Sequence, residues 1–209
     1  MYHGEKLNSI SHLVGTVFSF IALGSLLTVS IRIGTPAAII GFTVFGLSMA
    51  LLYTVSTLYH GFREPNLKRK LKTLDHISIY VLIAGSYTPF MLVSMSATSG
   101  PLILSTVWAL ALLGIVAEIF LSGRVAKIIQ VVAYLGIGWI CAIDIENIRA
   151  TLPAQGFFWL LTGGIAYTAG IVFYVIDKLN WINHAHGIWH FFVLAGSVSH
   201  FISIIGFVR

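Results

Sequence analysis

Seven long apolar runs alternate with short polar segments along the chain. They cover approximately residues 10–31, 36–60, 75–95, 101–121, 125–143, 157–176 and 186–207. A helix needs roughly 20 apolar residues to cross about 30 Å of hydrocarbon, and each run has about this length. Glycine, proline or other turn residues separate the runs. The pattern predicts an all-α, polytopic membrane protein with seven transmembrane helices.

The composition supports this prediction. Hydrophobic residues make up 57% of the 209 residues and charged residues only 9%, whereas a soluble domain has about 25% charged residues. A soluble protein is therefore excluded. The segments between the runs are too short to build a second domain, so we expect a single seven-helix domain over residues 1–209.

The net charge of +5 indicates topology rather than a nucleic-acid partner, because Lys and Arg concentrate in cytosolic loops of membrane proteins. With seven spans, the N-terminus shares a side with the loops after the second, fourth and sixth runs. Nine of the 12 Lys and Arg residues lie on that side. We expect a cytosolic N-terminus and an extracytoplasmic C-terminus, which is opposite to the orientation of G-protein-coupled receptors.

Polar residues from three runs fall at one depth under this topology. His60 ends the second run, Asp75 begins the third, and His186 and His190 begin the seventh. His186 and His190 share a helix face, because residues i and i+4 differ by about 40° around the axis. Ser56 has the same spacing from His60, one turn deeper in the membrane.

These residue types indicate a metal centre. Three imidazoles, from His60, His186 and His190, with one open coordination position are typical of a catalytic zinc site. Zinc lowers the pKa of its bound water to about 7. Asp75 is then the candidate to orient that water or accept its proton. Ser56 is the candidate to donate a hydrogen bond to the developing oxyanion or to steer a ligand.

Simpler roles remain open for single residues. The histidines can contact lipid headgroups, and Asp75 can cap a helix N-terminus, where negative charge is favourable. His76 points about 100° away from Asp75, so we expect it to contact headgroups. His200 lies about 15 Å deeper than His190 and is expected to pack or to line an inner cavity. The common depth of the four residues favours the metal centre.

Three further polar residues, Glu5, Asn8 and His12, share one face at the start of the first run. They are expected either to support the site from the cytosolic side or to form a polar face at the membrane surface.

Together these motifs resemble a known family. They are S56-T-L-Y-H60, Asp75, G85-S-Y-T-P-F90, H186-G-I-W-H190, and the Glu5, Asn8, His12 spacing. The set resembles the hemolysin III proteins, the bacterial branch of the progestin and adiponectin receptor (PAQR) family, which is more distantly related to alkaline ceramidases. The resemblance covers nearly the whole chain.

The resemblance implies seven helices with a cytosolic N-terminus, in a bacterial inner (plasma) membrane. It also implies zinc held at His60, His186 and His190, with Asp75 and Ser56 beside it. The family name suggests cytolysis, but these spans are constitutively apolar, unlike those of a soluble toxin that converts on contact with a membrane.

We expect membrane lipids as partners and a zinc-dependent hydrolase of a lipid amide or ester as the leading function. A sensor or regulator of membrane state, with zinc holding helices together, is the alternative. A transporter or channel predicts ionisable residues near mid-membrane, where His200 is the one candidate. A retinal protein needs a buried lysine, and all six lysines lie at or beyond the ends of runs.

Overall fold

The computed structural model describes residues 4–209, and that part of the chain is helical without any strand. The elements are α1 (Lys6–Ile33), α2 (Pro36–Gly61), α3 (Pro65–Pro89), η1 (Phe90–Ser94), α4 (Gly100–Phe120), α5 (Gly123–Gly138), η2 (Ile140–Asp144), α6 (Ile145–Thr151), α7 (Ala154–Leu179) and α8 (Ala185–Phe207). Within the described residues, seven helical segments are long and apolar enough to cross a membrane. The prediction of an all-α protein with seven transmembrane helices is confirmed.

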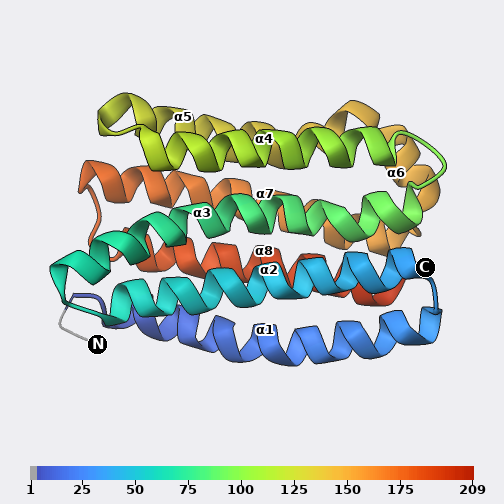
Figure 1. The fold of residues 1–209 in the computed structure, drawn as a ribbon, viewed down its shortest axis with the longest axis horizontal. Helices are drawn as coiled ribbons and strands as arrows, with labels where there is room; N and C mark the ends of the chain where they lie inside the picture. Colours follow the sequence, from blue (N-terminus) through green and yellow to red (C-terminus); the bar gives the residue numbers. More distant parts are fainter. Residues whose placement is uncertain (1–3) are drawn as a thin grey trace.

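The helices run side by side in an elongated bundle, and the C-terminus lies at the end opposite the start of α1 (Figure 1). The start of α1 lies at the same end as the α2–α3, α4–α5 and α7–α8 turns. We call this the N-terminal end of the bundle. The first helix, α1, packs against both α2 and the last helix, α8.

The surface of the bundle is apolar and its interior carries hydroxyl groups. Leu102, Leu113 and Phe120 are 71%, 65% and 78% exposed, as suits side chains that face lipid. Most buried serines satisfy their hydroxyls locally, as where Ser48 donates to the Phe45 carbonyl at 2.7 Å. The protein is therefore built for hydrocarbon outside and polar pairing inside.

Helix α3 starts earlier than the apolar pattern predicts. It begins at Pro65, and the Glu64 carboxylate accepts hydrogen bonds from the backbone N–H groups of Asn66 and Leu67. Asp75 consequently lies three turns inside the helix and is buried. Capping of a helix N-terminus by Asp75 is wrong, because a different carboxylate already does this.

Two helices break at the opposite half of the bundle. After Pro89, α3 continues as the single π-helical segment η1, and α5 ends at Gly138, before the predicted residue 143, and continues as η2 and α6. The Tyr87 hydroxyl, from the last turn of α3, contacts the break in α5. It donates to the Ile137 and Gly138 carbonyls at 2.9 and 2.7 Å, and accepts from the Cys141 N–H at 3.2 Å. Tyr87 thus satisfies backbone groups that the break in α5 frees.

His76 does not have the role that the sequence predicts. Its Nδ1 lies 2.6 Å from Glu118 Oε1, and Gln130 Nε2 donates to the other oxygen of Glu118 at 3.0 Å. The expected headgroup contact is wrong, because His76 turns inward and joins α3 to α4 and α5.

Candidate metal centre

Three histidines converge at the N-terminal end of the bundle. His60 comes from the last turn of α2, and His186 and His190 come from the first two turns of α8. Their ligand atoms all lie within 4.8 Å of one another. His60 and His190 are buried, and His186 is largely so. The three residues that the sequence singled out therefore form one group that can hold a metal ion.

The unpartnered atoms of this group fit that use. Nε2 of His60, of His186 and of His190 is buried and has no hydrogen-bond partner. Buried polar atoms are normally paired, so three orphaned nitrogens that lie together need an explanation. A shared metal ion satisfies all three at once.

Glu5 holds the His60 ring in the orientation that this requires. Its Oε2 accepts from His60 Nδ1 at 2.6 Å and from Asn8 Nδ2 at 2.9 Å, and its Oε1 accepts from Lys68 Nζ at 3.3 Å. Partial burial raises the pKa of Glu5, but the hydrogen bonds from His60 and Asn8 and the nearby charges outweigh it and lower that pKa to about 2. The carboxylate stabilises this end fully above about pH 4.5, and its contribution is lost as the pH falls towards 2.

The other two rings are held in the same way. His186 Nδ1 lies 3.2 Å from Asp177 Oδ2. His190 Nδ1 lies 3.1 Å from the Asn8 carbonyl oxygen and 3.0 Å from Ser11 Oγ. Carboxylate and carbonyl oxygens only accept, so the proton of each ring belongs on Nδ1, as it does in His60. Each Nε2 then carries the lone pair that a metal needs, and each Nδ1 partner orients its ring.

The first helix supplies most of these partners. Glu5, Asn8 and His12 recur at intervals of three and four residues and so face α2 and α8 together. A Cβ on Gly187 would lie 2.5 Å from Leu7 Cδ2 and 3.1 Å from Asn8 Oδ1. A glycine between the two α8 histidines therefore lets α1 approach closely enough for Asn8 to reach His190. Of the two possibilities for this face, the structure favours support of the site.

Asp75 and Ser56 lie beside the histidines. They are 3% and 1% exposed. The Asp75 carboxylate interacts electrostatically with His60 and His186 and has Ser56 as a polar neighbour. The Ser56 hydroxyl is buried without a hydrogen bond of ordinary geometry. The position of both residues suits the predicted roles, and those roles stay predictions.

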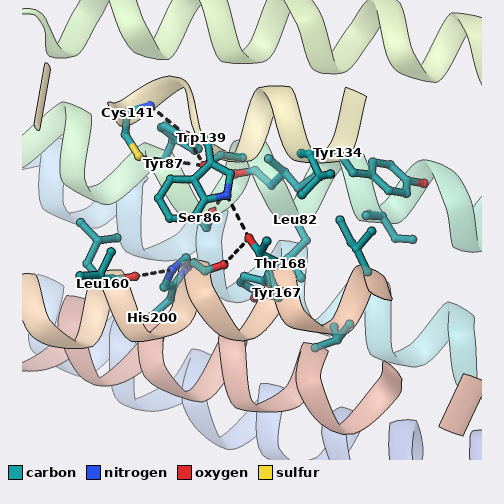
Figure 2. Close-up of a pocket in the computed structure, with 18 of the residues that line it drawn as sticks. Leu82, Ser86, Tyr87, Tyr134, Trp139, Cys141, Leu160, Tyr167, Thr168 and His200 are labelled. Carbon is teal, nitrogen blue, oxygen red and sulfur yellow. Dashed lines mark hydrogen bonds between the residues drawn. The ribbon is translucent and has the colours of Figure 1, made fainter. Parts of the chain in front are cut away.

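An apolar cavity lies along the bundle (Figure 2), and its wall includes Asp75, which lies beside the metal centre, but not His60, His186 or His190 themselves. Side chains of α3, α5, α7 and α8 form most of its wall, with His12 and Asp75 at one end and His200 far along it. The wall formed by α3 and η1 runs from Asp75 to Phe90, about 22 Å along the helix axis. His200 lines this cavity, as the sequence allows, and its Nε2 donates to the Leu160 carbonyl at 3.2 Å.

Two residues of the centre have no counterpart in the sequence analysis. Asp177 holds His186, and Ser11 holds His190. A signal for Asp177 existed, since it directly follows the apolar run 157–176, nine residues before His186 and at the same end. Ser11 resembles the other serines of the spans and carries no such signal.

Known proteins match this chain over nearly its whole length, including all residues of the metal centre. The model of the family described as "Haemolysin-III related" matches residues 1–201. The chain is 40% identical to "Hemolysin-3" of Bacillus cereus over 204 residues, which cover 98% of this chain and 91% of that protein. It is 41% identical to "Hemolysin-3 homolog" of Bacillus subtilis (strain 168) over 201 residues, which cover 96% and 92%.

Proposed function

We propose, from the premise that this chain belongs to the haemolysin-III related family, that it is a zinc-dependent hydrolase of a lipid amide or ester. One observation carries the proposal. A long apolar cavity ends at the buried carboxylate of Asp75, beside three imidazoles whose Nε2 atoms lack partners. An apolar space that reaches a carboxylate beside a metal centre suits a substrate with an acyl chain and a polar head.

The donor set fits zinc. His60, His186 and His190 supply the usual protein complement of a catalytic zinc site, which is three nitrogen ligands with one position left open. When bound there, zinc acts as a Lewis acid and makes water a nucleophile near neutral pH.

The cavity, Asp75 and Ser56 each have a separate role in the reaction. The cavity holds the acyl chain and places the carbonyl group at its Asp75 end. Asp75 accepts a proton from the water that adds to the carbonyl carbon, and passes it to the leaving amine or alcohol as the C–N or C–O bond breaks. The Ser56 O–H donates to the carbonyl oxygen as negative charge develops there. The products are a fatty acid and an amine or alcohol.

We further place the protein in the inner (plasma) membrane of a bacterium, with the metal centre on the cytosolic side. The nine-to-three distribution of Lys and Arg supports this orientation. Substrate then enters from the lipids of the bilayer, which are the expected partners.

A sensor of membrane state with a structural metal is the second candidate. It is favoured by the way in which the centre joins α1, α2, α7 and α8 through hydrogen bonds to its ligands. The relatives carry the name hemolysin-3, so lysis of erythrocytes by the purified protein is a third measurement to make.

The decisive variant is Asp75→Asn, which keeps the size of the side chain and removes its charge. We expect it to retain about one zinc per chain and to release fatty acid at least about 100-fold more slowly, the usual loss for a general base. Zinc content and fatty-acid release are measured on protein in lipid nanodiscs, with a panel of acylated lipids. Asp144→Asn, the same change at the opposite end of the bundle, is the matched control.

The possible results separate the candidates. Unchanged release by Asp75→Asn contradicts the general-base role. Loss of zinc together with activity makes Asp75 a ligand instead. If the wild-type protein carries zinc and releases fatty acid from no lipid of the panel, the sensor becomes the better interpretation.

A further inference from the structure

His12 is a fourth buried histidine at the metal centre, and it is unlike the other three. It is 2% exposed, and neither of its ring nitrogens has a hydrogen-bond partner. Each other histidine with an unpartnered buried nitrogen, among residues 4–209, has a partner on its second nitrogen. His12 is not a member of the group of three that can hold a metal.

The packing of the His12 ring explains why the ring lies here, but it gives neither ring nitrogen a hydrogen-bond partner. The ring is stacked on His190, with centroids 3.5 Å apart and planes 10° from parallel. Its edge meets Tyr53 at a centroid distance of 5.1 Å. A phenylalanine ring would stack in the same place without burying two unpaired polar atoms, which are unfavourable in a protein interior. A histidine at this position therefore indicates a hydrogen-bond partner that is not part of the chain.

The cavity shows where that partner comes from. The cavity wall next to the metal centre includes His12 and Asp75, together with apolar residues such as Leu52, Ile79 and Val193. Tyr134 and Tyr174 also line this end, but their hydroxyls already donate to the His76 carbonyl and to Gln130 Oε1. An occupant that fills the cavity up to this end meets the His12 ring. A neutral imidazole offers it one N–H donor and one acceptor.

We propose that His12 is a binding residue that donates a hydrogen bond to the carbonyl oxygen of an acyl lipid whose chain lies in the cavity. A carbonyl oxygen only accepts, so it needs a donor, and Asp75 as a carboxylate has none to offer. His12 thereby holds the acyl carbonyl next to Asp75 and Ser56. This inference rests on the proposed function for the class of lipid, but binding of the carbonyl does not require that the lipid be cleaved.

The test uses a probe that cannot be hydrolysed, a long-chain methyl ketone labelled with ¹³C at its carbonyl. The ketone keeps the carbonyl oxygen and lacks a leaving group. Binding to the protein in nanodiscs is followed by the carbonyl resonance, which moves downfield when the oxygen accepts a hydrogen bond. The measurement is made with zinc-loaded protein and after chelation, so that any effect of the ion on the carbonyl is separated from that of His12.

We expect wild-type protein to shift the resonance downfield in both states and to bind the ketone. His12→Phe should keep the zinc content, lose the shift and bind the ketone at least about 10-fold more weakly. His12→Gln, which restores an N–H donor, should recover part of both. His12→Phe should also melt at or above the wild-type temperature, because it removes two unpaired polar atoms and keeps the stacked ring.

Three results would overturn the proposal. They are ketone binding and shift unchanged in His12→Phe, no binding by the wild type, and loss of zinc from His12→Phe, which would make His12 a ligand. If His12→Phe does not fold, His12→Leu replaces it in the same comparison. Failure of the wild type to release fatty acid, with a ketone shift that depends on His12, rejects the hydrolase and keeps the inference.

Discussion

Replacement of Glu5 by Gln tests whether the partners of the histidine rings tune metal binding. The change keeps an oxygen that can accept from His60 Nδ1 and removes the negative charge. Loss of such a partner typically lowers metal affinity 10- to 100-fold. The Glu5–His60 contact is short, at 2.6 Å, and the His60 side chain is only 3% exposed, so we expect about a 30-fold loss, or roughly 2 kcal/mol.

Asp177→Asn should have a smaller effect through His186. That contact is longer, at 3.2 Å, the Asp177 side chain is 29% exposed, and the same oxygen also accepts from Lys178 at 3.1 Å. A screened and shared charge contributes less. We expect about a 10-fold loss of zinc affinity, or roughly 1.4 kcal/mol. Asp177→Asn should therefore weaken zinc binding less than Glu5→Gln does.

The assay is competition for zinc between the purified protein in nanodiscs and a chelator of known affinity. Glu64→Gln is the matched control, because it makes the same change of charge at the same end, where Glu64 is exposed and accepts hydrogen bonds from backbone N–H groups of α3. It should leave zinc affinity unchanged. Affinities of Glu5→Gln within twofold of wild type, or a larger loss in Asp177→Asn than in Glu5→Gln, would refute the reasoning.

Three further predictions concern the bundle. A reporter fused after Arg209 should be extracytoplasmic and one inserted near Lys70 cytosolic, and the reverse would remove the argument for a cytosolic metal centre. Removal of zinc by a chelator should lower the melting temperature, since a ligand at 100 times its Kd adds about 2.7 kcal/mol to the free energy of unfolding. A melting temperature that zinc does not change would contradict binding. Gly114→Ala should destabilise by about 1–3 kcal/mol in a reversible unfolding assay, because its Cβ would lie 2.2 Å from the Tyr80 ring. Gly24→Ala, where nothing lies within 4 Å, is its control and should be neutral or stabilising.

The seven spans were predictable because hydropathy alone determines which segments can cross a bilayer. The residues at which the helices begin and end were less predictable. Helix α3 begins ten residues before Asp75, in a charged segment outside the apolar run. Helix α5 ends at Gly138, where Tyr87 of another helix satisfies the freed backbone carbonyls. Such a partner lies 50 residues away in sequence, where local pattern carries no information about it.

Part of the candidate metal centre could likewise be predicted from the sequence, and part of it could not. His186 and His190 are one turn apart on one helix, so their shared face follows from helix geometry. The order of the seven spans places His60 and Asp75 at the same end of the bundle as these two histidines, because His60 ends the second span and Asp75 begins the third. The contact of Asp177 with His186 depends instead on how the chain turns between α7 and α8, and that of Ser11 with His190 on the close approach of α1.

The contact between the first and last helices has a consequence for biosynthesis. A membrane protein is made from its N-terminus, at about 5–20 residues per second. Ser11 and its partner His190 are 179 residues apart, so roughly 9–36 s of translation separate them. During that time His60 is in the membrane without the other two histidines. A metal ion that needs all three histidines can therefore bind only after α8 has been made.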